Sequence, residues 1–244
     1  MKSPIVNNIL SEYTQQQYDK VFVTHWGKST LTYNATEVHY NTSAPQFHNE
    51  HEIDHNMRLI REQGYNATTP DQYVYVDPQP KATFPKVIGL HSGCFGGVWE
   101  KKKYPYFASL AYELMERGFI VKNFGNDKEK LPLDHPNYIE LAGVLSLQEI
   151  INEISSCNYF IANDSGLMHV ADALHIPLVA IFGPTLVTKN RPVSSTSKVL
   201  VGNLPCEPCQ YTNNFNTCSK NICLTLMLPN VILEYITTTL KWDH

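Results

Sequence analysis

Two apolar runs with a polar turn between them constrain the fold of this chain more than any other feature. Residues 159–162 and 177–182 are typical of buried strands, and the polar segment Asn163–His169 directly follows the first run. A strand, a sharp turn and a helix that begins at Asp-Ser-Gly place free backbone N–H groups at a helix N-terminus, which is a ready site for phosphate. We expect Asp164 to be the N-cap and Gly166 to let a ligand approach the backbone closely.

The helix after this turn has two faces. At helical spacing Ser165, His169 and Asp172 share a polar face, which we expect to look into a cleft at the carboxyl end of the preceding strand. Backbone N–H groups of Ser165, Gly166 and Leu167 would be the anion donors. The opposite, apolar face, which we expect to pack on a sheet, consists of Leu167, Val170, Ala171 and Leu174.

From Lys86 onward, predicted strands and helices alternate. The pattern predicts strands over 87–91, 119–124, 159–162, 177–182 and 198–201, and helices over 106–117, from Ser146, after Ser165 and over about 229–241. Ser146 and Glu149 have the spacing of a capping box. Such alternation implies an α/β fold with a parallel sheet and right-handed crossovers.

The first 84 residues are more polar and less periodic. Here the sequence predicts one strand over 20–25 and one helix over 49–63. The proline-rich stretch 77–80, with Pro85, reads as a stiff linker. We therefore predict two domains, 1–84 and 85–244.

The segment around the polar turn resembles a known family, the heptosyltransferase-type glycosyltransferases (glycosyltransferase family 9). The resemblance runs in order from about Tyr18 to the C-terminus, and its specific part is one block of residues. That block comprises Asp164-Ser165-Gly166, Met168-His169, Ala171, Ala173-Leu174, Pro177 and Phe182-Gly183-Pro184-Thr185.

The resemblance implies a GT-B architecture, in which two Rossmann-like domains face each other and the C-terminal one holds a sugar nucleotide. The activity it implies is inverting and metal-independent, and no cofactor is required. A heptose-like or other sugar would move from a nucleoside diphosphate to a hydroxyl group of a glycan, a lipid-linked sugar or a modified base. The last helix, over about 229–241, would return to the N-terminal domain.

Several residues acquire donor-binding roles from the resemblance. Lys102 would reach the diphosphate, with Lys103 as the competing assignment, and Glu129 would accept from the ribose hydroxyls. His169, beside Met168 in the matching block, would donate to a phosphate. Thr185 would close the pocket from the next strand end. Ser92 and Gly93, in a glycine-rich turn after the strand over 87–91, are further candidates for phosphate or sugar contact.

The acceptor side departs from the family pattern. Family members carry their base in a Gly-Asp turn, and this chain contains no Gly-Asp dipeptide. His25, at the end of the predicted N-terminal strand, is the candidate catalytic base. Residues around the start of the predicted helix could also face the cleft, namely Glu50, His51, Glu52 and Asp54. The N-terminal domain is expected to be reduced. We expect either that a second copy of the chain (a homo-oligomer) or another protein covers the cleft, or that the site is open and suits a bulky acceptor. The alternatives are a sugar-nucleotide-binding module or partner subunit without turnover, and a glycosyltransferase that modifies a nucleic-acid base.

Four of the six cysteines lie close together near the C-terminus. The spacing Cys206-x2-Cys209-x8-Cys218-x4-Cys223 could bind one structural zinc ion in tetrahedral geometry. The other interpretation is a set of free or opportunistically paired thiols.

Composition excludes several classes of protein. A hydrophobic content of 43% is ample for a packed core, and a net charge of −4 argues against a non-specific nucleic-acid binder. Apolar runs of about six residues are far shorter than the ~20 that span a bilayer. The N-terminus lacks the apolar stretch of a signal peptide. These features predict a cytoplasmic protein without a transmembrane segment.

Overall fold

The computed structural model of the chain describes residues 17–23, 34–40, 49–68, 76 and 79–242. Two compact units make up the chain. One comprises residues 1–71 with 188–190, and the other comprises residues 72–187 with 191–244. The boundary predicted between residues 84 and 85 stays a prediction.

The first unit contains a small parallel sheet and one helix. Strands β1 (Tyr18–Val23) and β2 (Ala35–Tyr40) pair in parallel, with Tyr18 opposite Ala35. Helix α1 (Glu52–Arg61) begins after His51, whose ring accepts a hydrogen bond from the Ile53 N–H. The helix predicted over 49–63 is thus confirmed, and β1 corresponds to the predicted strand. The sequence analysis missed β2, since its mixed polar pattern does not stand out.

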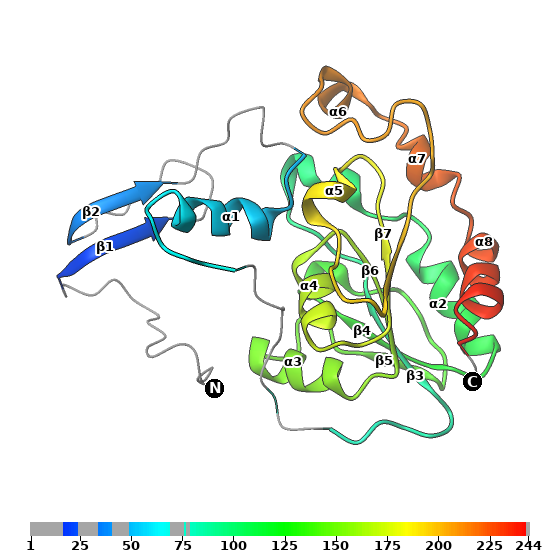
Figure 1. The fold of residues 1–244 in the computed structure, drawn as a ribbon. Coiled ribbons are helices and arrows are strands. Elements are labelled where there is room, and N and C mark those ends of the chain that lie inside the picture. Colours follow the sequence, from blue (N-terminus) through cyan, green and yellow to red (C-terminus); the bar gives the residue numbers. More distant parts are fainter. Residues whose placement is uncertain (1–16, 24–33, 41–48, 69–75, 77–78, 243–244) are drawn as a thin grey trace. The chain divides into compact units, whose positions relative to one another are not determined.

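The second unit is built on a six-stranded parallel sheet in the order β5-β4-β3-β6-β7-β8 (Figure 1). The strands are β3 (Val87–His91), β4 (Ile120–Phe124), β5 (Tyr138–Glu140), β6 (Tyr159–Asn163), β7 (Leu178–Ile181) and β8 (Ser197–Leu200). The chain runs outward from β3 to β5, and then returns to β6 beside β3 and runs outward the other way. This is the strand order of a doubly wound Rossmann-type fold. The predicted α/β class is therefore confirmed.

Helices cover both faces of the sheet. Figure 1 shows α2 (Phe107–Glu116) and α8 (Pro229–Glu234) on one face, and α3 (Leu147–Ser155) and α4 (Gly166–Ala173) on the other. The π-helical segment Tyr235–Thr239 continues α8. Shorter elements are two 3₁₀ turns, η2 (Gly97–Lys102) and η3 (Asp127–Glu129), and the helices α5 (Val187–Asn190), α6 (Asn213–Thr217) and α7 (Ile222–Thr225).

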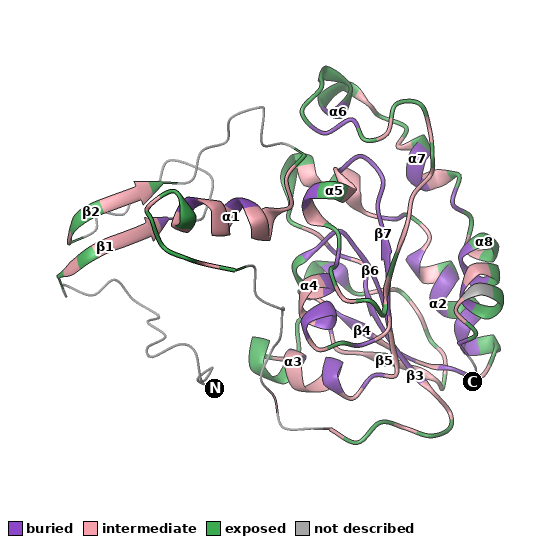
Figure 2. Ribbon diagram, viewed as in Figure 1, coloured by how far each residue is buried: buried purple, intermediate pink, exposed green. Residues whose placement is uncertain are grey.

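Two hydrophobic cores hold these layers together. Alternate residues of one strand point to opposite faces. Accordingly, Ile161 of β6 joins the core under α2 and α8, whereas Phe160 joins the core under α3 and α4. Figure 2 shows these central strands as buried. Gly89 of β3 leaves room for the Phe160 ring, which a Cβ atom would overlap. Burying each such large side chain contributes about 1.5–3 kcal/mol.

Local sequence signals account for most of these elements. The capping box predicted at Ser146 and Glu149 is present at the start of α3. The predicted final helix is present as α8 and its π-helical extension, which pack on the same core as α2. Its return to an N-terminal domain stays a prediction. Within the described part of the chain, no helix has the length and apolar character needed to cross a membrane.

Candidate functional site

The candidate site lies where the sheet changes direction. Strands β3 and β6 are neighbours, but their connections lead to opposite ends of the sheet. Open α/β sheets bind ligands in the crevice outside the carboxyl ends of strands at such a switch point. His91 ends β3 and Asn163 ends β6, so polar side chains stand at this edge on both central strands.

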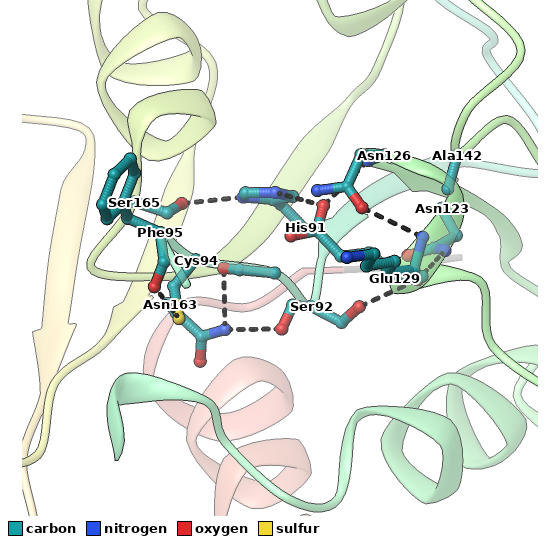
Figure 3. Close-up of polar contacts among 12 residues, drawn as sticks. His91, Ser92, Cys94, Phe95, Asn123, Asn126, Glu129, Ala142, Asn163 and Ser165 are labelled. Carbon is teal, nitrogen blue, oxygen red and sulfur yellow. Dashed lines mark hydrogen bonds and ion pairs between the residues drawn. The ribbon is translucent and has the colours of Figure 1, made fainter. Parts of the chain in front are cut away.

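A buried chain of polar contacts links three segments at this edge (Figure 3). The Ser165 hydroxyl lies 2.8 Å from Nδ1 of His91, and Nε2 of the same ring lies 3.4 Å from Oε2 of Glu129. Each of the three residues is less than one tenth exposed. The imidazole of β3 therefore joins the beginning of α4 to the 3₁₀ turn η3.

Glu129 is held tightly in this arrangement. Its carboxylate accepts from the Asn126 N–H at 2.8 Å, which completes a capping box around η3. Gly93 and Gly125 lie so close that a Cβ atom on either would overlap the carboxylate. Burial raises the pKa of Glu129, but the hydrogen bonds from His91 and the Asn126 N–H outweigh it, and the pKa lies below its ordinary value. The group is thus an ionised carboxylate at neutral pH.

A cation, Lys102, pairs with Asp164, the residue before Ser165. The Lys102 ammonium lies 3.2 Å from a carboxylate oxygen of Asp164 and 5.4 Å from the centre of the Trp99 ring. Asp164 is 4% exposed. The prediction that Asp164 is the N-cap of the helix is wrong. The N-cap is Ser165, and its hydroxyl contacts His91 rather than the first N–H groups of α4.

The polar face predicted for α4 is only partly correct. Asp172 was expected to look into the cleft, but it is 1% exposed and accepts hydrogen bonds from the N–H groups of Val193 and Ser194. The hydroxyl of Ser197 also donates to it. Its carboxylate therefore anchors the segment before β8. A buried carboxylate needs several donors, and the backbone of this segment supplies them.

The predicted donor residues of α4 divide between core and surface. Gly166 is exposed, and His169 and Leu167 are half-buried. Met168 is fully buried in the core under α3 and α4, so only its backbone could face a ligand.

Two cavities border the polar chain. The larger, of about 840 Å³, is lined by His91, Cys94, Gly125, Asn126, Asp127, Lys128, Glu129, Gly143, Leu145, Ile150 and Leu167. The smaller, of about 340 Å³, lies between Ser92, Lys103 and Glu129 on one side and the start of α2 on the other. Glu129 lines both. Their volumes fall in the range of about 300–1,000 Å³ that is usual for small-molecule sites.

The remaining predicted residues lie at the edge of this arrangement or elsewhere. Ser92 donates its hydroxyl hydrogen to the Glu129 carbonyl at 3.2 Å, and Lys103 pairs with Glu100 at 3.6 Å. Thr185 follows β7, is 1% exposed, and its hydroxyl has no hydrogen-bond partner within the part of the chain that the structure describes. His25 lies outside the described residues.

Sequence reasoning missed two residues of this site. It placed His91 only at the end of the predicted strand over 87–91. It gave no role to Asn163, which is fully buried, donates to the carbonyls of Ser92 and Gly93, and accepts from the Tyr104 N–H. His91 is the polar last residue of one predicted strand, and Asn163 directly follows another. That signal could have identified them.

The four clustered cysteines line a third cavity, of about 230 Å³, which shares no lining residue with the other two. N–H groups of Lys220 and Asn221 donate to the Cys218 sulfur and lower the pKa of its thiol. The cysteines are free thiols, and among the residues described no group of three or more His, Cys, Asp or Glu is arranged to hold a metal ion. Zinc binding stays a prediction, which elemental analysis of purified protein would test.

Comparison with known proteins gives consistent matches. The sequence model of one family, Glycosyltransferase family 9 (heptosyltransferase), matches residues 21–219. Lipooligosaccharide heptosyltransferase 2 of Haemophilus influenzae is 32% identical over 124 residues, which are 47% of this chain and 36% of that protein. Lipopolysaccharide heptosyltransferase 2 of Escherichia coli is 30% identical over 148 residues, covering 57% of this chain and 41% of that protein.

A solved structure supports the same relationship. The E. coli ADP-heptose lps heptosyltransferase II aligns with a TM-score of 0.53 and 28% identity, over 66% of this chain and 48% of that one. The chain thus spans about half the length, or less, of the relatives that it matches.

Proposed function

Because this chain belongs to glycosyltransferase family 9, we propose that it transfers a heptose-like sugar from an ADP-linked donor to a hydroxyl group of a glycan. The related E. coli structure is described as an ADP-heptose enzyme, which favours adenine as the donor base. The observation that carries the proposal is the convergence of Lys102, Ser165 and Glu129 at the switch point of the sheet.

We infer how the donor is bound from the chemistry of this edge. The diphosphate would lie at the N-terminus of α4, where N–H groups not capped by the Ser165 side chain and the helix dipole favour an anion. Lys102 would add a positive charge. The ribose hydroxyls would donate to the ionised Glu129, and the base would enter the 840 Å³ cavity.

The proposed transfer needs no metal ion. The acceptor hydroxyl attacks the anomeric carbon from the side opposite the diphosphate, and a base takes its proton as the bond to the leaving oxygen breaks. The configuration at that carbon is thereby inverted. Negative charge grows on the leaving ADP, and positioned donors and cations lower the barrier by stabilising that charge. Lys102 and the N–H groups of α4 would have this role.

Nucleotide binding is the first test of this proposal. ADP should raise the melting temperature by mass action, and more than UDP, GDP, CDP or TDP at equal concentration. Lys102→Ala should weaken ADP binding about ten- to a hundredfold, because it removes a charged contact. Lys198→Ala, an exposed lysine of β8, is the matched control and should bind as the wild type does. No shift with any of these nucleotides would refute the proposal.

Turnover is the second test. With ADP-heptose and a core glycan acceptor, the protein should release ADP, and EDTA should not stop the release. A donor that binds but is recovered intact with every acceptor would instead favour a sugar-nucleotide-binding module.

A further inference from the structure

The hydrogen atoms of the polar chain can be counted. Both ring nitrogens of His91 are engaged, Nδ1 by the Ser165 hydroxyl and Nε2 by the Glu129 carboxylate. An ionised carboxylate only accepts hydrogen bonds, so Nε2 must carry the hydrogen that faces it. In a neutral imidazole the other nitrogen is then an acceptor. Without a ligand, the single hydroxyl hydrogen of Ser165 therefore points to His91.

A bound phosphate changes this arrangement. Ser165 is the N-cap of α4, where the diphosphate would lie. While the His91 ring is neutral and the Ser165 hydroxyl hydrogen points to it, the Ser165 oxygen would turn its lone pairs toward the anion. That contact is repulsive. If the hydroxyl donates to a phosphate oxygen instead, it must accept from Nδ1, and Nδ1 must carry a hydrogen. Both ring nitrogens are then protonated, and His91 is an imidazolium.

The charges around the ring permit this change. Glu129 faces it from η3, where Asp127 and Lys128 line the same cavity. Cys94 lines that cavity from the loop after β3.

The lysines near the ring, on the side of η2, are already paired. Lys102 is paired with Asp164 and Lys103 with Glu100, so each lysine has a carboxylate partner. His169 lies one turn into α4. The contact that favours a positive ring is therefore the direct one with Glu129.

We propose that binding of a nucleoside diphosphate to this site takes up one proton, which His91 holds between Ser165 and Glu129. The inference rests on the proposed function, because it requires the diphosphate to lie at α4. His91 is a positioning residue that acts through Ser165. Its proton allows the hydroxyl to donate to the diphosphate, and the positive ring then faces the leaving group as its negative charge grows.

Linkage gives the sign of the effect. A ligand that binds together with a proton binds more tightly as the pH falls. Imidazole is the side chain whose charge ordinarily changes between pH 5 and 8. Affinity for ADP should therefore rise by up to about tenfold for each unit by which the pH falls, over the range in which the ring is neutral in the free protein and protonated in the complex.

Calorimetry in buffers with different heats of ionisation measures the uptake directly. Binding of ADP to the wild type near pH 7.5 should take up close to one proton more than binding to His91→Asn. Binding to His91→Asn should show only the protons that ADP itself takes up or releases. Ser165→Ala should lose the uptake although its histidine is intact, and Ser165→Thr should retain it. His135→Asn is the matched control, because that half-buried histidine, outside the candidate site, also contacts a carboxylate, Glu116, at 3.3 Å.

The protonation state of the ring can also be read by spectroscopy on the wild-type protein. In ¹⁵N spectra of the histidine rings, one ring should change from a singly to a doubly protonated pattern when ADP binds, and this ring should be missing in His91→Asn. Equal proton uptake by wild type and His91→Asn, with ADP bound by both, would overturn the inference and leave the proposed function standing. Absence of ADP binding by the wild type at every pH would refute the proposed function itself.

Discussion

Glu129 combines burial with two hydrogen-bond donors to its carboxylate. It is 8% exposed, and its carboxylate contacts the His91 ring and the Asn126 N–H. Two glycines, Gly93 and Gly125, leave it the space that a side chain would fill. Because donors surround a charged group that has lost water, the charged form is favoured, and the pKa lies below the ordinary value of 4.5.

This lowered pKa predicts a pH-dependent contribution of Glu129 to stability. A depressed folded-state pKa stabilises the fold fully above the unfolded value, and the contribution is lost as the pH falls through the folded value. In urea denaturation, Glu129→Gln should be less stable than the wild type at neutral pH. The difference should shrink as the pH is lowered below 4.5, the ordinary value for this group. A difference that is constant with pH would contradict this.

At the scale of elements, the proposed anion site lies at the N-terminus of α4. The helix begins at Gly166, which is exposed and would have open space around a Cβ atom. Gly93, in the loop after β3, differs because a Cβ atom there would overlap the Glu129 carboxylate. Gly93 thus keeps space free for a side chain of the protein, whereas Gly166 would keep space free for the proposed ligand.

Replacing the two glycines should therefore have different consequences. Gly166→Ala should keep or raise the free energy of unfolding, by up to about 1 kcal/mol from helix propensity, but should weaken ADP binding because the methyl group stands where the phosphate approaches. Gly93→Ala should lower both stability and ADP affinity. Urea denaturation and calorimetry measure the two quantities. Unchanged ADP binding by Gly166→Ala would show that the ligand does not approach this backbone.

At the scale of the whole molecule, the described residues contain the donor side of the proposed transferase. The six-stranded sheet and the two cavities all belong to the second unit. The reaction also needs a group that takes the proton of the acceptor. The candidate from the sequence, His25, belongs to the first unit, in a segment that the structure does not describe.

If His25 is the base, its replacement should separate binding from turnover. His25→Ala should lower the transfer rate about 10²- to 10⁴-fold, the usual range for a lost general base. ADP affinity should stay at the wild-type value, since the donor contacts lie in the second unit. Steady-state kinetics with ADP-heptose and calorimetry with ADP provide the two measurements. A variant that retains full activity would exclude His25 as the base.

Local chemistry let the sequence predict where the elements lie. Apolar runs placed the strands of the sheet, Ser146 and Glu149 marked the start of α3, and the Asp-Ser-Gly turn marked the start of α4. These signals depend on residues within one turn or one strand of each other, so they need no knowledge of tertiary structure. They also placed the proposed anion site at a strand end, because alternation of strands and helices implies a parallel sheet.

Only the tertiary structure decided which side chains meet. His91 and Ser165 are 74 residues apart in the chain, and Lys102 and Asp164 are 62 apart, yet each pair is in contact because β3 and β6 are neighbours in the sheet. Asp172 has the helical spacing of a cleft residue but is buried by a segment that begins 21 residues later. Periodicity assigns a residue to a face, whereas strand order and loop path determine what covers that face.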